Sequence, residues 1–256
     1  MDTTVLAFAN QKGGVGKTTS TVNIAAALGH LGYKTLLIDA DPQGNASTGV
    51  GVVKRGLRKS LYTVLTGGCA AADAIQETEY KNLSVLPTTI ELAAAEFDLI
   101  EREQHQAALK EAIASLGGVY DYVLIDCPPS LGLLTVNALA AADSVVIPMQ
   151  CEYYALEGLT QLMMTIRRVK QTHNPALTVC GILITMYDGR LNLSAQVLDE
   201  LKKYYAEKLF RSVIPRNVKL SEAPSFGKPI FYHDKYSRGS LAYLDIAKEI
   251  AERTGV

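Results

Sequence analysis

Residues 4–19 read TVLAFANQKGGVGKTT, and this stretch decides the fold. The apolar run Thr4–Ala9 predicts a buried β-strand, and the residues that follow the loop, Thr18–Leu31, predict a helix. Between them lie three glycines within four positions, which let the backbone turn sharply and bring its N–H groups close to a ligand. A glycine-rich turn that opens a helix binds phosphate, because the helix N-terminus offers unpaired N–H donors and the positive end of its dipole.

The loop departs by one residue from the pattern G-x-x-x-x-G-K-[ST], because Gln11 stands where the first glycine would be. Lys17 is placed to reach the β- and γ-phosphates of a nucleotide, and the Thr18 hydroxyl is placed to bind Mg²⁺. The sequence therefore predicts a nucleotide-binding loop. Its expected nucleotide contacts are Gly13, Gly14, Val15, Gly16, Lys17, Thr18 and Thr19.

Lys12 stands at the start of this loop, where the general pattern requires no charge. It comes too early in the loop to reach the γ-phosphate of the nucleotide that its own loop binds. The side chain either reaches a nucleotide held by a second subunit or is an ordinary lysine in solvent, and its position leaves both interpretations open.

Two further aliphatic runs end in aspartate. The run LLIDAD ends at Asp41, and the run VLID ends at Asp126. Ligands of open parallel sheets bind beyond the carboxyl ends of the strands, so these side chains are expected near the phosphates. We predict that Asp126 and Asp39 support Mg²⁺, and that Asp41, further out, orients the attacking water. Asp39 has an alternative interpretation, in which it caps a turn with Pro42.

Short apolar runs alternate with longer helical stretches along the rest of the chain. The runs are apolar throughout, as is typical of parallel strands buried on both faces. The sequence therefore predicts a doubly wound α/β fold, a mainly parallel sheet flanked by helices, in one domain over residues 1–256. The expected strands are Thr4–Ala9, Thr35–Asp39, Leu83–Pro87, Tyr122–Asp126, Ser144–Pro148, Val179–Thr185 and Phe210–Ile214. The expected helices are Thr18–Leu31, Glu91–Leu116, Leu156–Gln171, Ser194–Lys208 and Ser240–Arg253.

Composition excludes several classes of protein. The 256 residues are 48% hydrophobic and 20% charged, which suits a globular domain and argues against disorder. No apolar run approaches the ~20 residues of a membrane span, and no secretory signal follows Met1, so we expect a cytoplasmic protein. The four cysteines form no Cys-x-x-Cys pair, which excludes a zinc ribbon and offers no disulfide framework.

The net charge of −1 hides an uneven distribution. Residues 1–162 carry 10 Lys+Arg and 17 Asp+Glu, whereas residues 163–256 carry 15 and 9. The basic part of the chain either binds a polyanion on one face or forms solvated helix surfaces, and charge alone leaves both interpretations open.

These motifs resemble the ParA/MinD group of P-loop ATPases with a deviant Walker A motif. KGGVGKT at 12–18 is similar to the motif of that group, with its extra signature lysine at Lys12. DADPQGN at 39–45, CEYYALEG at 151–158 and IPRNVKLSEAPS at 214–225 resemble the ParA branch specifically. The similarity extends from Thr4 to about Ala251 and is greatest to the short chromosomal type called Soj.

The resemblance implies a slow ATPase that uses ATP and Mg²⁺ and forms a homodimer when ATP is bound, with Lys12 on the partner's phosphates. The dimer would bind double-stranded DNA without sequence preference and associate with the nucleoid. A ParB-like centromere-binding protein would stimulate hydrolysis, which splits the dimer and releases DNA. Such a cycle partitions a chromosome or plasmid. By the same resemblance, Pro215 and Asn217 belong to the loop that binds the base.

Basic residues of the C-terminal third fall in expected loops or at expected helix ends, which suits contacts to DNA phosphates and provides no base-reading element. Arg190 and Lys219 are the first candidates, because turn-like segments expose them. Arg216 either contacts DNA or packs near the adenine, and any one of these side chains can also be a solvated charge. The predicted DNA-binding residues are Arg190, Arg216, Lys219 and Arg238.

Three other classes fit less well. A MinD-like membrane-associated ATPase needs a basic amphipathic C-terminal helix, but AKEIAERTGV at 247–256 also carries acidic residues and lacks Phe and Trp, so no membrane partner is expected. An electron carrier like the nitrogenase iron protein would need cluster cysteines, and the sequence around Cys127 and Cys151 matches the ParA branch instead. The retained phosphate-loop and acidic residues oppose a nucleotide-binding scaffold without hydrolysis.

Overall fold

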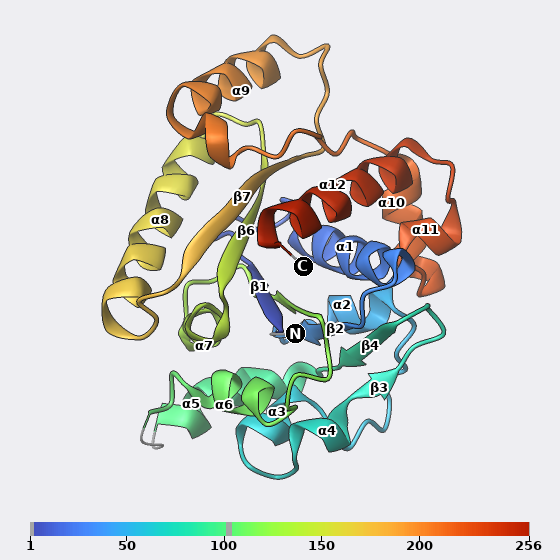
Figure 1. The fold of residues 1–256 in the computed structure, drawn as a ribbon, viewed down its shortest axis with the longest axis vertical. Helices are drawn as coiled ribbons and strands as arrows, with labels where there is room; N and C mark the ends of the chain where they lie inside the picture. Colours follow the sequence, from blue (N-terminus) through green and yellow to red (C-terminus); the bar gives the residue numbers. More distant parts are fainter. Residues whose placement is uncertain (1–2, 101–103, 256) are drawn as a thin grey trace.

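The phosphate loop lies between a buried strand and a long helix, as the sequence predicts. A computed structural model describes residues 3–100 and 104–255 of the chain (Figure 1). Its strands are β1 (Thr4–Phe8), β2 (Thr35–Asp39), β3 (Gln76–Glu77), β4 (Leu83–Leu86), β5 (Tyr122–Asp126), β6 (Ser144–Gln150) and β7 (Thr178–Thr185). They form one sheet in the order β3-β4-β2-β5-β1-β6-β7. Every neighbouring pair is parallel except β3 and β4.

Helices cover both faces of this sheet, so the doubly wound α/β prediction is confirmed. On one face α1 and α12 pack against each other, and α7 and α8 lie on the opposite face (Figure 1). The helices are α1 (Lys17–Leu31), α2 (Asn45–Gly49), α3 (Leu61–Leu65), α4 (Ala71–Ala74), α5 (Ala95–Ile100), α6 (Ala108–Ala114), α7 (Leu133–Ala141), α8 (Ala155–Thr172), α9 (Asn192–Tyr205), α10 (Val218–Glu222), α11 (Ile230–His233) and α12 (Arg238–Thr254). Within the described ranges, none of them combines the length and apolarity that crossing a membrane requires.

The alternation of side chains along β1 explains the two layers of core. Leu6 and Phe8 are buried together with the apolar residues of α1 and α12. Val5, Ala7 and Ala9 are buried with those of α7 and α8 on the other face. Because successive residues of a strand point to opposite faces, a strand buried on both sides must be apolar throughout.

Two predicted elements differ from the structure. The stretch Glu91–Leu116 is not one helix: it contains a 3₁₀ turn at Ile90–Ala94, then α5 and α6, and residues 101–103 lie outside the described part. The predicted strand Phe210–Ile214 is wrong. This segment is irregular and makes only scattered contacts with β7, including a hydrogen bond from Phe210 N to Ile182 O (3.1 Å).

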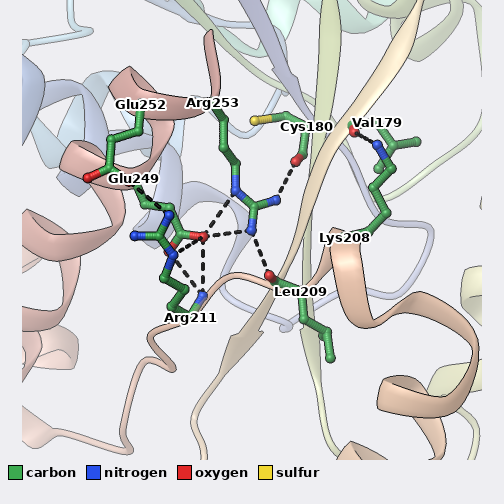
Figure 2. A network of polar contacts seen from close by, with 8 residues as sticks. All are labelled: Val179, Cys180, Lys208, Leu209, Arg211, Glu249, Glu252 and Arg253. Carbon is green, nitrogen blue, oxygen red and sulfur yellow. Dashed lines mark hydrogen bonds and ion pairs between the residues drawn. The ribbon is translucent and has the colours of Figure 1, made fainter. Parts of the chain in front are cut away.

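Side chains of α12 form the hydrogen bonds with this irregular segment that a neighbouring strand would otherwise form (Figure 2). Glu249, only 4% exposed, accepts a hydrogen bond from Arg211 N at 3.0 Å. Arg253 pairs with Glu249 at 2.6 Å and donates to the carbonyl oxygens of Cys180 (2.7 Å) and Leu209 (2.6 Å). Backbone groups that leave water need such partners. The ion pair therefore fixes the course of the chain at 209–211, where a ladder of strand hydrogen bonds is missing.

Replacing Arg253 with Met is expected to lower the free energy of unfolding by about 3 kcal/mol, because the buried Glu249 carboxylate loses the guanidinium that hydrogen-bonds it and keeps only the more distant Arg211 side chain, at 3.9 Å. The matched control is Arg211→Met. The Arg211 side chain is 73% exposed, lies 3.9 Å from Glu249 and pairs with the exposed Glu252 at 2.9 Å, and such exposed pairs contribute little. Its backbone N–H, which donates to Glu249, remains in the variant. The control should stay within about 0.5 kcal/mol of the wild type in urea unfolding. Equal losses in the two variants would contradict the assignment.

Candidate nucleotide-binding site

Neighbouring strands hold the loop between β1 and α1 in its conformation. Gly14 and Gly16 have φ values of 74° and 81°, in the left-handed region that favours glycine. Thr185, at the end of β7, donates to Val15 O at 2.7 Å, and Gln150, at the end of β6, donates to Gly14 O at 2.8 Å. These two hydrogen bonds hold the loop carbonyls against the sheet. The loop continues into α1, whose first N–H groups have no partner within the helix and can bind an anion.

Lys17 is the first residue of α1 and is 6% exposed. Its ammonium donates to Lys12 O at 3.3 Å. Burial lowers the pKa of Lys17, whereas the charges of nearby acidic groups, Asp126 first, oppose that shift. A buried ammonium beside a row of N–H donors provides a strong positive field for phosphate oxygens.

Two aspartates lie side by side next to this lysine. Asp39 ends β2 and Asp126 ends β5, and the two residues are paired in register, each fully buried. Burial raises the pKa of both carboxyls, and the charge of Asp39 raises that of Asp126 further. Sequence analysis placed both residues at strand ends, and the structure brings them together.

The two carboxylates differ in how their oxygens are used. Asp39 Oδ2 accepts hydrogen bonds from Ser47 N and Ser47 Oγ, both at 2.7 Å, and its Oδ1 accepts from Asp41 N at 3.4 Å. Asp126 Oδ1 accepts from Thr21 Oγ at 3.0 Å. Asp126 Oδ2, in contrast, is buried without a hydrogen-bond partner among the described residues.

The unpaired oxygen of Asp126 fits a cation beside the phosphates. The Thr18 side chain also lies close to the Asp126 carboxyl, so a hydroxyl and a carboxylate lie together where the sequence predicts Mg²⁺. Over the described residues, no three His, Cys, Asp or Glu side chains gather into a metal site of their own. That suits Mg²⁺, which is usually held by one or two protein groups, several waters and the phosphates of its nucleotide.

Asp41 lies two residues beyond the end of β2 and faces the cleft described below. It is 7% exposed, and its Oδ1 accepts a hydrogen bond from Gln43 N at 3.0 Å. Its carbonyl accepts from Gly44 N at 2.8 Å. The turn after β2 is therefore closed by Asp41, whereas Asp39 contacts the start of α2.

A cleft of about 490 Å³ is lined by residues from both the N-terminal and the C-terminal part of the chain. The phosphate loop forms one wall, and the segment after the irregular stretch at 209–214 forms the other. Asn217 caps α10 by accepting from Lys219 N at 2.9 Å. The predicted residues that line the cleft are Gly13, Gly14, Gly16, Lys17, Thr18, Thr19, Asp41, Pro215, Arg216 and Asn217. Val15, Lys12, Asp39 and Asp126 are not part of its lining.

Lys12 instead points to the outside of the loop, where its ammonium forms an ion pair with the Glu152 carboxylate. The two side chains are 41% and 48% exposed. The loop beneath Lys12 is fixed, because Lys12 N donates to Asn10 Oδ1 (3.0 Å) and Asn10 donates to Pro148 O (2.7 Å). The Lys12 ammonium is therefore accessible to solvent, whereas its backbone is held by hydrogen bonds.

The predicted DNA-binding residues surround one end of the cleft. Tyr187 N donates to Ile214 O at 2.9 Å, which places the loop of Arg190 beside the segment of Arg216 and Lys219. Gly239, next to Arg238, packs against Leu220 of α10. All four basic side chains are exposed. Arg190 is paired with Asp188 (2.7 Å) and Lys219 with Glu222 (2.8 Å).

Several supporting residues were missed by the sequence analysis. Ser47 bonds Asp39, Thr21 bonds Asp126, and Gln150 and Thr185 hold the loop. Thr21 offers a weak signal, because it comes one helical turn after Lys17 and so lies on the same face of α1. The others are polar residues near strand or helix ends, and no motif distinguishes them from ordinary turn residues.

The paired aspartates predict a specific pH dependence for the nucleotide-free protein. The pKa of Asp39 is raised to about 6 and that of Asp126 to about 8, so the folded state keeps protons that the unfolded state releases near pH 4. Stability should therefore fall as the pH rises from about 4 to about 8. In Asp126→Asn the loss between pH 6 and pH 8 should be smaller than in the wild type.

Chemical unfolding at pH 6, 7 and 8, without nucleotide or magnesium, measures this dependence. Asp73→Asn is the control, because that carboxylate is exposed and pairs only with the exposed Lys59. A pH profile of Asp126→Asn that matches both Asp73→Asn and the wild type would show that Asp126 does not contribute.

Comparison with known proteins agrees with this geometry. A protein-family model described as an AAA domain matches residues 3–179. The sporulation initiation inhibitor protein Soj of Bacillus subtilis is 53% identical over 247 residues, covering 96% of this chain and 98% of the relative. The chromosome partitioning protein ParA of Caulobacter vibrioides is 50% identical over 251 residues, covering 97% of this chain and 94% of the relative.

Solved structures show the same fold with nucleotide bound. A Mycobacterium smegmatis protein with ADP and magnesium, described as cobyrinic acid a,c-diamide synthase, has a TM-score of 0.85 at 39% identity, over 99% of this chain and 97% of that one. The septum site-determining protein MinD of Pyrococcus horikoshii, complexed with Mg-ADP, has a TM-score of 0.82 at 28% identity, over 99% and 98%. The chain is similar to Soj and ParA over nearly its full length, and it has the phosphate loop and the acidic residues of an ATPase that uses ATP and Mg²⁺. It therefore belongs to the ParA/Soj family of P-loop partition ATPases.

Proposed function

We propose that the protein is a dimeric DNA-binding switch that moves or positions a chromosome or plasmid. ATP joins two copies and gives them affinity for DNA, and hydrolysis, stimulated by a ParB-like centromere-binding protein, separates them on the nucleoid. The observation that carries the proposal is the cleft itself. It is lined by the phosphate loop and by the segment at 215–217, which carries Arg216, so a bound nucleotide would contact both the hydrolytic residues and the segment that leads to the basic surface.

The residues of the cleft divide the work of hydrolysis. Lys17 would neutralise the β- and γ-phosphates, and Thr18, Asp126 and Asp39 would support Mg²⁺. When bound, the ion offsets charge that develops on the phosphate oxygens. Asp41 orients water for attack on the γ-phosphorus; the bond to the bridging oxygen breaks, and ADP and phosphate leave. Pro215 and Asn217, on the opposite wall, are proposed to contact the base.

Lys12 is proposed to act on the nucleotide of the partner subunit. Its exposed ion pair with Glu152 keeps the ammonium outside its own cleft. Exposed pairs of this kind contribute little to stability, so the lysine can exchange a carboxylate for a phosphate at small cost. Inside an interface the new contact would be shielded from water and correspondingly stronger.

Lys12→Ala is expected to weaken ATP-induced dimerisation by roughly 2 kcal/mol or more, because the partner's phosphates lose a desolvated cation. Multi-angle light scattering with ATP and magnesium across a range of protein concentrations measures the effect. Lys59→Ala removes another exposed, ion-paired lysine and should leave dimerisation unchanged. A Lys12→Ala protein that dimerises like this control would refute the role of Lys12 in the partner's site.

DNA binding is proposed for the exposed basic residues around the end of the cleft. Arg190 and Lys219 are each paired with a carboxylate that a DNA phosphate can replace, and Arg216 lies at the border between the cleft and the surface. Arg238 opens α12. The apolar face of that helix packs against α1 instead of being free to enter a lipid surface, which favours DNA over the MinD-like alternative.

Arg190→Ala should weaken DNA binding to every sequence alike and lower the slope of log K against log salt by about 1, as expected for one lost phosphate contact. Fluorescence anisotropy with two unrelated duplexes at several salt concentrations, in ATP and in ADP, gives both quantities. Arg58→Ala removes an exposed arginine from the acidic part of the chain and should change neither. Wild-type binding that is equal in ATP and ADP would overturn the proposed switch.

A further inference from the structure

Lys54 lies behind the turn that carries Asp41. Its ammonium donates to the carbonyl oxygens of Gln43 (2.9 Å) and Gly44 (3.1 Å), the last two residues before α2. Lys54 is half-buried, and no carboxylate in the described parts of the chain pairs with it. Its charge is therefore directed at two successive carbonyl groups, whereas a surface lysine more often extends into water.

The turn is shaped to receive this lysine. Gly44 has φ 66°, which favours glycine, and a Cβ atom placed there would lie 2.9 Å from Lys54 Nζ, so a larger residue would displace the ammonium. On the opposite side of the turn, the Asp41 carboxylate accepts from Gln43 N. The peptide units around Gln43 are thus held by Asp41 from one side and by Lys54 from the other.

The hydrogen bonds of Ser47 hold a different point. Ser47 Oγ donates to Asp39 and accepts from Thr88 N at 3.1 Å, which fastens the first turn of α2 to the ends of β2 and β4. Gly44 O also accepts from Thr48 N (3.2 Å) and Thr48 Oγ1 (3.1 Å) of α2, whereas these bonds do not reach the carbonyl of Gln43. Lys54 comes from the loop after α2, so it ties the Asp41 turn to a separate segment of the chain.

We propose that Lys54 is a positioning residue for ATP hydrolysis: it fixes the turn at 41–44 so that the Asp41 carboxylate stays aimed at the attacking water. Lys54 is not among the residues that line the cleft, so it acts through the turn and not on the nucleotide. The inference rests on the proposed role of Asp41. A displacement of about 1 Å in a catalytic group can slow a reaction by up to about 100-fold. The hydrogen bonds of Lys54 to the turn can therefore affect the rate of hydrolysis.

Lys54→Met tests the proposal, because Met keeps an unbranched stem beside Gly44 and removes the donors. Arg55→Met is the matched control: it removes one positive charge from the adjacent, exposed position of the same loop. In single-turnover hydrolysis of prebound ATP, the rate constant of Lys54→Met should fall about tenfold relative to Arg55→Met. The dissociation constant for ATP and the melting temperature should match those of the control.

Asp41→Asn, alone and combined with Lys54→Met, separates this inference from the proposed function. If Lys54 acts through Asp41, Asp41→Asn is slow and the double variant is no slower, because the two changes disable one device. Normal hydrolysis in Asp41→Asn would refute the proposed role of Asp41. Slow hydrolysis in Asp41→Asn with a control-like rate in Lys54→Met would refute the positioning role alone. Parallel losses of rate, ATP affinity and melting temperature in Lys54→Met would also overturn it, since they would indicate a folding role.

Discussion

Two carboxylates buried side by side at the ends of β2 and β5 are the constraint on which the rest of the site depends. Removing two like charges from water is costly, and the protein offsets that cost only in part. Ser47 donates two hydrogen bonds to Asp39, Thr21 donates one to Asp126, and Lys17 provides a nearby cation. The oxygen of Asp126 that has no donor leaves the arrangement incomplete without a cation, which couples the energy of the fold to the nucleotide and its magnesium.

The strand order makes this arrangement possible. β5 lies between β2 and β1, so the carboxyl end of β1, where the phosphate loop begins, is next to Asp126 and one strand away from Asp39. The residues that hydrogen-bond the two aspartates and the phosphate loop come from several elements: Thr21 from α1, Ser47 from α2, Gln150 from β6 and Thr185 from β7. A parallel sheet brings such side chains to one edge although they are far apart in sequence.

Much of this centre could be predicted from the sequence, because its signals are local. A strand, a glycine-rich turn and a helix within 28 residues give the phosphate loop, and apolar runs that end in Asp39 and Asp126 give the acidic pair. The alternation of such runs with helical stretches gave the doubly wound sheet. The predicted strand at Phe210–Ile214 failed although its β-branched and aromatic residues fit a strand. Its hydrogen bonds to β7 are scattered, and the chain at 209–211 is held by Glu249 and Arg253, about 40 residues later. The ion pair of Lys12 with Glu152, 140 residues apart, has no local signal either.

The hydrogen bonds between α12 and the chain at 209–211 have a consequence for folding during synthesis. The segment that follows, at 214–217, forms one wall of the nucleotide cleft, and Tyr243 of α12 lines the same cleft. A nascent chain can build the phosphate loop early, from β1 and α1, but the pocket is complete only once α12 has been synthesised and has packed against α1. Helix α12 therefore sets the point during synthesis at which the whole cleft can first form.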